Sequence, residues 1–162
     1  MSKQPWWTGA KGEWYVVVQF LLLGLTVFGP ASLPNWPAWS GMWRTITIVI
    51  GLLVGGIGGL FILSGLFSLG SNLTAVPHPK EDAFMVVHGA YRFVRHPIYS
   101  GIILGAFGLG FLRGGWLGLL YALILFFFFD IKSRREEAWL REKYADYADY
   151  QQRVHKLVPF VY

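Results

Sequence analysis

The sequence predicts an all-α integral membrane bundle of four transmembrane helices, in which the last helix has a long cytoplasmic extension. The chain of 162 residues is 54% hydrophobic and only 14% charged, whereas average globular chains carry about 25% charged residues. Four long stretches, at 14–43, 45–79, 98–112 and 114–129, contain no charged side chain. Because a bilayer core about 30 Å thick takes roughly 20 apolar helical residues, these stretches indicate membrane spans and exclude a disordered chain.

Each uncharged stretch corresponds to one expected span. The expected spans cover about 14–31, 46–69, 97–112 and 115–130. Between the last two, Arg113-Gly114-Gly115 predicts a tight turn that joins an antiparallel helix pair. The length suits one domain over residues 1–162, with a cytoplasmic loop at 70–96 and a cytoplasmic helix and tail at 131–162.

The distribution of basic residues predicts the orientation. Four spans place both termini and the middle loop on one side of the membrane. That side holds twelve of the 14 basic residues: Lys3, Lys11, Lys80, Arg92, Arg95, Lys132, Arg134, Arg135, Arg141, Lys143, Arg153 and Lys156. The other side holds Arg44 and Arg113. Because cytoplasmic segments are enriched in Lys and Arg, we expect a multi-pass protein with both termini cytoplasmic, in a bacterial or archaeal inner membrane.

The first apolar run also resembles a signal peptide, but Gly29-Pro30-Ala31-Ser32 is a poor cleavage site, and we expect an uncleaved anchor.

Composition excludes several kinds of site. No cysteine is present, which removes disulfides, thiolate zinc sites, iron–sulfur clusters and cysteine nucleophiles. His78, His88, His96 and His155 show no paired ligand spacing, so no metal is expected. The net charge of +5 comes from residues that flank the apolar stretches, which indicates membrane lipids as partners and no nucleic acid.

Glycines recur along the second and third expected spans. The second contains Gly51, Gly55 and Gly59 at intervals of four, and the third contains Gly101, Gly105 and Gly108. Small residues at this spacing let helices approach closely in lipid. We expect packing within the bundle, with dimerisation as the alternative, and the oligomeric state stays open.

The end of the chain predicts a long helix, because residues 119–158 contain neither glycine nor proline. The fourth helix is expected to continue past Asp130 into the cytoplasm, to about Gln152. Its contact face is read from helical spacing as Glu136, Leu140, Tyr144, Tyr147 and Gln151. The expected partner of this face is the polar loop from Tyr91 to His96 on the same side.

Arg95-His96-Pro97 marks the start of the third helix. Proline keeps the preceding residue out of the helical conformation and suits the first helical position, so the helix is expected to begin at Pro97 with His96 as its cap. The unpaired N–H groups of the first turn, beside Arg95, form a candidate site for a carboxylate or phosphate. In the alternative, Arg95 binds lipid phosphates and His96 only caps the helix.

Glu136 and Glu137 form the second local signal. Adjacent acids on a helix commonly pair with nearby bases, here Arg134, Arg135 or Arg141. The other interpretation is a carboxylate that binds a cationic group such as an α-ammonium. Together with the anion site, it would fit an amino-acid zwitterion.

These motifs carry a resemblance to a known family. Arg95-His96-Pro97-Ile98-Tyr99-Ser100-Gly101 resembles the Arg-His-Pro-x-Tyr-x-Gly signature of the isoprenylcysteine carboxyl methyltransferase family, which is related to the phospholipid N-methyltransferases. The pattern also fits Gly89-x-Tyr91, Glu136-Glu137-x-x-Leu140, Tyr144, Tyr147, Tyr150, Val154 and Pro159. The resemblance covers about residues 72–159. Ala145 departs from it, since a glycine is expected after the aromatic residue.

The resemblance implies an integral membrane methyltransferase that uses S-adenosylmethionine. Its acceptor would be lipophilic: an isoprenylcysteine-like carboxylate, a phospholipid amine or another hydrophobic small molecule. The cofactor-binding positions that it implies are Gly89, Tyr91, His96, Pro97, Tyr99, Glu137, Leu140 and Tyr147. The candidate catalytic residues are Arg95, to neutralise an acceptor carboxylate or phosphate, and Glu136, as a base for which His96 and water are alternatives. Tyr99 and Glu137 are expected to face one shared cavity.

A non-enzymatic scaffold or transporter subunit is the alternative function. Transport paths usually place ionisable residues at bilayer depth. Apart from Asp130 at the end of the last one, the four expected spans contain no charge, only Gln19 and a few hydroxyl groups, which counts against a transporter. The length of the chain counts against a sterol reductase, whose relatives have many more spans.

Overall fold

The structure is a computed structural model that describes residue 9 and residues 11–37, 39–159 and 161–162. Lys3, one of the basic residues expected in the cytoplasm, lies outside the described residues. The described part is helical, which confirms the all-α class. Its helices are α1 (Glu13–Phe28), α2 (Gly41–Leu69), α3 (Pro97–Arg113), α4 (Trp116–Lys143) and α5 (Tyr147–Arg153), with 3₁₀ turns η2 (Gly70–Asn72) and η3 (Gly89–Arg92).

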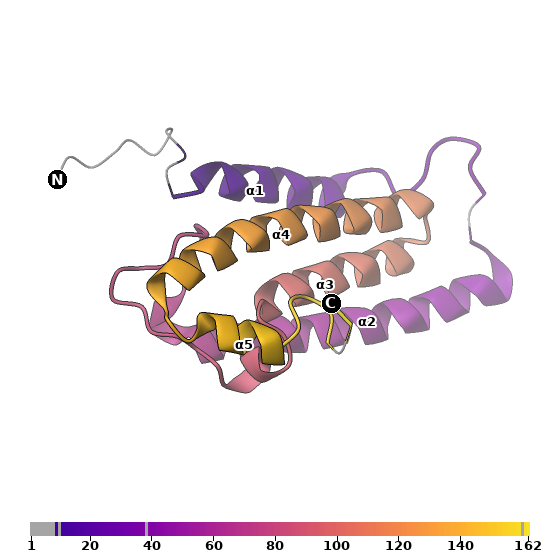
Figure 1. Ribbon diagram of the computed structural model, residues 1–162. Coiled ribbons are helices and arrows are strands. Elements are labelled where there is room, and N and C mark those ends of the chain that lie inside the picture. Colours follow the sequence, from indigo (N-terminus) through magenta and orange to yellow (C-terminus); the bar gives the residue numbers. More distant parts are fainter. Residues whose placement is uncertain (1–8, 10, 38, 160) are drawn as a thin grey trace.

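The four long helices lie side by side in the order α1, α4, α3, α2 (Figure 1). The buried core lies between α3 and α4, around Ile103, Leu125 and Phe129. The outer faces of α1 and α2 are apolar and exposed, with Phe20 at 64% and Leu60 at 68% exposure. Apolar faces of this extent are rare on soluble monomers, and they fit a hydrocarbon environment.

Two of the four expected spans are long enough to cross a membrane. They are α2 with its 3₁₀ extension, Gly41–Asn72, and α4, with 32 and 28 residues. α1 and α3 have 16 and 17 residues, which gives about 24 and 26 Å at 1.5 Å per residue. That is shorter than a hydrocarbon core of about 30 Å, so the spanning of α1 and α3 stays a prediction.

The α2–α3 interface is built on glycines seven residues apart. Gly51, Gly58 and Gly65 are buried in α2, and a Cβ on Gly58 would lie 2.7 Å from the carbonyl oxygen of Gly101. The predicted packing role is confirmed for Gly51 and Gly55, four residues apart, because a Cβ on Gly108 of α3 would lie 2.8 Å from the carbonyl oxygen of Gly51 and 2.7 Å from Cα of Gly55. It is wrong for Gly59, where a Cβ would meet no described atom within 4 Å. Residues seven apart nearly return to the same helix face after two turns. Residues in a repeat of four move gradually around the helix, so the last of them no longer faces α3.

The helical hairpin follows the sequence prediction. α3 begins at Pro97 with His96 as N-cap and ends at Arg113. Gly114 then adopts a φ of +69°, a left-handed conformation that glycine takes without strain. α4 starts two residues later, at Trp116.

The two basic residues at the turn end of the bundle, Arg44 and Arg113, cap helices. Arg44 donates to the carbonyl oxygens of Phe111 and Leu112, at 3.1 and 2.6 Å, at the end of α3. Arg113 donates to the last carbonyls of α1 and to Gly29. These carbonyls lack intrahelical partners. Hydrogen bonding to them therefore explains why these two basic residues lie at the end of the bundle that otherwise lacks them.

α4 ends at Lys143, so the prediction of one helix to about Gln152 is wrong. Tyr144 is extended, with φ −121° and ψ 119°, and its hydroxyl donates to the Ala83 carbonyl oxygen at 2.7 Å. The chain then turns back into α5, which buries Tyr147 and Tyr150. Tertiary contacts of these tyrosines, rather than a helix-breaking residue, end the helix.

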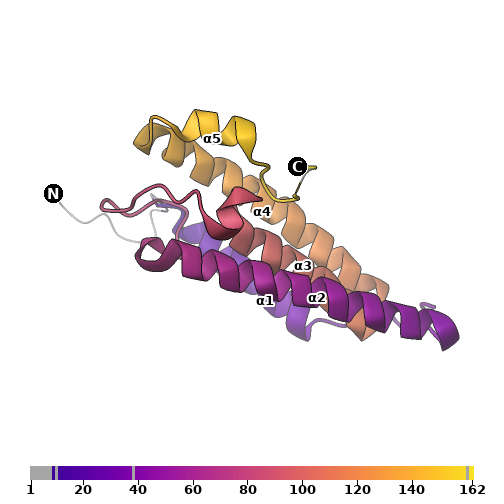
Figure 2. The same cartoon turned by 90° about the horizontal axis from the view of Figure 1, so that it is seen from below.

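The whole loop at 70–96, called the polar loop from here on, gathers with the second half of α4 and with α5 at one end of the bundle. This end lies opposite the α3–α4 turn (Figure 1, Figure 2). An isolated parallel bridge joins Val94 to His155, and the Arg95 N–H donates to the His155 carbonyl oxygen at 2.8 Å. The predicted packing of the C-terminal segment on this loop is confirmed.

Candidate functional site

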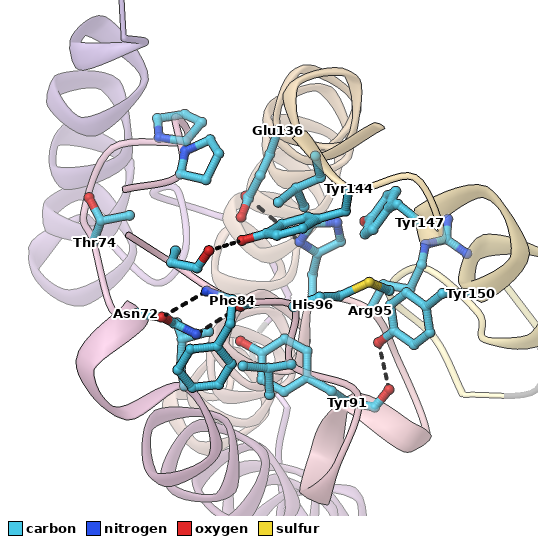
Figure 3. A pocket seen from close by; sticks show the side chains of 17 residues that line it. Asn72, Thr74, Phe84, Tyr91, Arg95, His96, Glu136, Tyr144, Tyr147 and Tyr150 are labelled. Carbon is cyan, nitrogen blue, oxygen red and sulfur yellow. Dashed lines mark hydrogen bonds and ion pairs between the residues drawn. The ribbon is translucent and has the colours of Figure 1, made fainter. Parts of the chain in front are cut away.

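A cavity lies where the polar loop, the start of α3, α4 and α5 meet (Figure 3). We call it the tyrosine cavity. Its lining consists of Leu69, Asn72, Thr74, Pro77, Pro79, Ala83, Phe84, Met85, Val86, Tyr91, Arg95, His96, Glu136, Leu140, Tyr144, Tyr147 and Tyr150. Concave, mostly apolar sites with a few polar groups are typical of small-molecule binding.

His96 connects the start of α3 to both glutamates of α4. Its Nε2 lies 3.1 Å from Oε1 of Glu137, and its Nδ1 lies 3.7 Å from Oε2 of Glu136. Glu136 accepts a second contact, from the Tyr99 hydroxyl at 2.8 Å. The imidazole is buried, with 6% exposure, so its orientation is fixed from both sides.

Arg95 and Glu137 form a buried ion pair behind the cavity wall. Nε of Arg95 donates to Oε1 of Glu137 at 2.7 Å, and Nη1 donates to the carbonyl oxygens of Gln151 and Val154. The amide of Gln151 donates to the other Glu137 oxygen at 2.8 Å. Burial by itself raises the pKa of Glu137, but the hydrogen bonds from His96 and Arg95 outweigh it and lower the pKa to about 2.

This ion pair changes the interpretation of the Arg95 motif. The Nε and Nη1 donors of Arg95 are committed to Glu137 and to tail carbonyls, so Arg95 holds α3, α4 and the tail together. The described structure therefore does not support an open anion site at Arg95, and its catalytic role stays a prediction. Arg134, one proposed partner of the glutamates, pairs with Asp130 instead.

Four tyrosines form one side of the cavity, and two are anchored to backbone. The Tyr144 hydroxyl donates to Ala83, and the Tyr150 hydroxyl donates to the Tyr91 carbonyl oxygen at 2.6 Å (Figure 3). The Tyr147 hydroxyl is buried without a hydrogen-bond partner among the described residues. Burial, then the charges of Glu137 and Glu136, raise the pKa of Tyr147 well above its ordinary value, so this hydroxyl keeps its proton and is a donor.

A second chamber adjoins the tyrosine cavity on the side of α1. We call this space the lysine chamber. Its lining consists of Gln19, Leu69, Leu73, Thr74, Ala75, Tyr91, His96, Ile98, Tyr99, Ile102, Lys132 and Glu136. Tyr91, His96 and Glu136 line both spaces, so the two spaces are direct neighbours.

The structure places six predicted site residues in the tyrosine cavity: Tyr91, Arg95, His96, Glu136, Leu140 and Tyr147. Tyr99 lines the lysine chamber, while Gly89, at φ +60°, lies against Ser68 of α2. Pro97 is buried beside Gly65.

The expectation that Tyr99 and Glu137 share one cavity is wrong. His96 stands between them, because Tyr99 stacks on its ring at 5.3 Å and Glu137 contacts its Nε2. Glu137 lies instead on a hollow beside Gln151. The carboxylate that Tyr99 does share a chamber with is Glu136.

Sequence reasoning missed the loop wall of the cavity. Asn72 pairs with the backbone of Phe84, donating to its carbonyl oxygen at 2.9 Å, and this brings residues 83–86 to the cavity. The available signal was Asn72 itself, a polar residue directly after a long apolar stretch. Its partner, twelve residues away in an irregular loop, has no periodic pattern that reveals it.

Comparisons with known proteins identify a family and several relatives. The phospholipid methyltransferase family profile matches residues 46–147, more than half of the chain. A probable protein-S-isoprenylcysteine O-methyltransferase of Oryza sativa subsp. indica is 31% identical over 116 residues, 69% of this chain and 61% of that protein. The cobalt-zinc-cadmium resistance protein CzcN of Cupriavidus metallidurans is 26% identical over 160 residues, 91% of this chain and 62% of that protein.

The fold has a solved counterpart. The structure of the eukaryotic intramembrane Ras methyltransferase ICMT (isoprenylcysteine carboxyl methyltransferase) matches with a TM-score of 0.65 at 24% identity, covering 99% of this chain and 55% of that one. The chain thus spans about three fifths of the length of the two relatives above. From the family profile and the motifs at its cavity, the chain belongs to the phospholipid methyltransferase family, with the isoprenylcysteine carboxyl methyltransferases among its relatives.

Proposed function

We propose that this chain is an integral membrane methyltransferase that binds S-adenosylmethionine in the tyrosine cavity and methylates a lipophilic acceptor. The observation that carries the proposal is the unpartnered, buried hydroxyl of Tyr147 in a cavity that also holds the Glu136 carboxylate. Two relatives support the reaction class by name, because the rice protein and the solved counterpart are both methyltransferases of isoprenylcysteine.

The residues of the tyrosine cavity fit this cofactor. S-adenosylmethionine carries a sulfonium and an ammonium, and cations are attracted to aromatic faces and to carboxylates. Tyr91 and Tyr147 offer such faces, and Glu136 offers a carboxylate whose side chain is 25% exposed. The Tyr147 hydroxyl needs an acceptor, which an oxygen or nitrogen of the cofactor would provide. We assign His96 and Leu140 to the walls of the same site.

The chain contributes mainly positioning. When bound, S-adenosylmethionine supplies a methyl group on a positively charged sulfur. Holding two reactants in line can lower a barrier by about 7–11 kcal/mol in favourable cases. The fixed elements here are Tyr144 and Tyr150, anchored to backbone carbonyls, and His96, held between two glutamates. Glu136 borders both chambers and is placed to accept a proton from an acceptor that must lose one.

We further propose that all four long helices cross the membrane, with the tyrosine cavity at the cytoplasmic surface. The short helices α1 and α3 pack along the longer α4 (Figure 1). Every basic residue of the described chain except Arg44 and Arg113 belongs to a segment expected on the cytoplasmic side, and those two cap helices. This distribution supports cytoplasmic termini.

Calorimetry with S-adenosylmethionine, on the full-length protein in detergent, tests the cofactor site. The wild type is expected to bind, and Glu136→Gln is expected to weaken binding by about tenfold, since a hydrogen bond to a charged group contributes roughly 1.5–3 kcal/mol. Glu142→Gln is the matched control, because Glu142 is exposed on the same helix and lines neither chamber.

Transfer of a labelled methyl group into total lipid and small-molecule extracts tests the reaction. Labelled product from the wild type, strongly reduced with Glu136→Gln, is the expected result. A wild type that folds but neither binds S-adenosylmethionine nor transfers label would contradict the proposal and favour a non-enzymatic membrane scaffold.

A further inference from the structure

Lys132 is a buried cation that faces the lysine chamber. Its exposure is 1%, and its Nζ donates to Oε1 of Gln19 in α1 at 2.6 Å. Among the described residues no carboxylate lies within ion-pair distance of this Nζ. The other buried lysine of the described chain, Lys156, shows the usual arrangement, since it pairs with Asp130.

The protein satisfies Lys132 only in part. A lysine ammonium has three donors and no acceptor, and Gln19 is its only hydrogen-bond acceptor among the described residues. The ring of Tyr99, at 5.0 Å, and that of Phe129, at 6.0 Å, add weaker cation–π contacts. Glu136, about one helical turn further along α4, accepts from Tyr99 instead. Because a buried charge is costly without a partner, this ammonium favours an anionic group in the chamber.

The rest of the lysine chamber fits the apolar part of such a ligand. Leu69 of α2 and Ile98 and Ile102 of α3 line it. The chamber also meets the tyrosine cavity at Tyr91, His96 and Glu136. A ligand whose polar head lies at Lys132 and whose apolar chain lies among these side chains is therefore next to the proposed cofactor.

We propose that Lys132 determines acceptor specificity by binding the negatively charged oxygen head, a carboxylate or a phosphate, of a lipophilic acceptor in the lysine chamber. This inference rests on the proposed function and deepens it. A head of this kind arrives ionised, so no side chain has to remove a proton from it. The same charge disfavours a cationic amine head, because a second cation would lie beside a buried ammonium.

Gln19 is a positioning residue in this arrangement. It comes from α1, whereas the other polar side chains of the chamber come from α3, α4 and the polar loop. Its amide oxygen fixes the lysine without neutralising it. Gln19→Glu keeps the size of the side chain but pairs with the ammonium, so it is expected to remove the anion preference while leaving the fold intact.

The test uses matched ligand pairs and the full-length protein. Binding of an N-acetylated isoprenylcysteine is compared with that of its carboxamide, and binding of phosphatidic acid with that of diacylglycerol, by calorimetry in a non-ionic detergent. The wild type is expected to bind at least one of the two acids with an affinity about tenfold higher than that of its neutral match. This is the size of effect expected for a hydrogen bond to a charged group. The pair that shows the preference identifies a carboxylate or a phosphate.

Lys132→Met has nearly the same length without the charge. For this variant and for Gln19→Glu, the affinities for the acid and for its neutral match are expected to lie within about twofold of each other. Lys11→Met is the control, because Lys11 is exposed and lies outside both chambers, and this variant should keep the wild-type preference for the acid. S-adenosylmethionine affinity and the thermal midpoint are measured in parallel to establish that each variant is folded. If Lys132→Met does not fold, Gln19→Glu decides.

The two proposals fail separately. A wild type that binds no S-adenosylmethionine contradicts the proposed function. A wild type that binds it but shows no acid preference, or variants that retain the full preference, overturn the assignment of Lys132 alone.

Discussion

Nε2 of His96 lies 3.1 Å from Oε1 of Glu137, and this contact joins the residue before α3 to the second half of α4 across 41 positions of sequence. The same carboxylate also accepts hydrogen bonds from Nε of Arg95 and from the side-chain amide of Gln151. Glu137 of α4 is thus the common acceptor for two other segments, the residues that precede α3 and the helix α5. The tyrosine cavity lies over this cluster, so its shape depends on the charge of one buried carboxylate.

Glu137→Gln should destabilise the fold. Removing one partner of a buried ion pair leaves the other uncompensated, here Arg95, and we expect a loss of roughly 3 kcal/mol in the free energy of unfolding. Reversible denaturation in mixed micelles measures it. Glu142→Gln, an exposed acid on the same helix, should change stability by less than about 0.5 kcal/mol.

The contribution of Glu137 should also depend on pH. The pKa of Glu137 is lowered from 4.5 to about 2 in the folded protein, so its stabilisation is complete above the unfolded value and is lost as pH falls. The difference in stability between wild type and Glu137→Gln should be constant from pH 6 to 8 and shrink between about 4.5 and about 2. A difference that grew on acidification would contradict the ion-pair assignment.

Tyr147→Phe should separate binding from folding. Its hydroxyl has no partner among the described residues, so removing it should leave the thermal midpoint unchanged or slightly raised. Affinity for S-adenosylmethionine should fall about 2–10-fold, the value of a neutral hydrogen bond. Tyr144→Phe is the contrasting control, because that hydroxyl holds Ala83, and its loss should lower stability. Unchanged affinity in Tyr147→Phe would remove this hydroxyl from the cofactor site.

Gly58→Ala should disrupt the α2–α3 interface. A Cβ there would lie 2.7 Å from the Gly101 carbonyl oxygen, and overpacking of this kind typically costs about 1–3 kcal/mol. Gly56→Ala is the matched control on the same helix. A Cβ on Gly56 meets no described atom within 4 Å, so this change should be neutral or stabilise α2. Thermal unfolding in detergent measures both, and equal effects would contradict the seven-residue packing.

Local rules predicted the helix boundaries well. Pro97 fixes the start of α3 through its own backbone, and Gly114 ends it, because each acts on dihedral angles of adjacent residues. The end of α4 escaped prediction for the opposite reason. The contact that ends it, from Tyr144 to Ala83, spans 61 positions, and no local pattern encodes it.

The candidate site was predictable in its residues more than in their roles. Motif spacing brought His96, Glu136 and Leu140 to one place, because residues four apart share a helix face. The family resemblance placed Glu137 at the cofactor with Glu136 nearby, although neighbours on a helix point about 100° apart. Glu136 faces the cavity, and Glu137 faces the tail.

By itself, the sequence determined that the chain is helical, apolar along four stretches and basic at one end of them, since these properties depend only on composition and short-range periodicity. Only the tertiary structure decided which carboxylate faces a ligand, which tyrosine hydroxyl lacks a partner, and that Lys132 lies against Gln19. The physical reason is that such contacts depend on the packing of helices distant in sequence, and helix packing fixes the rotation of each helix about its axis.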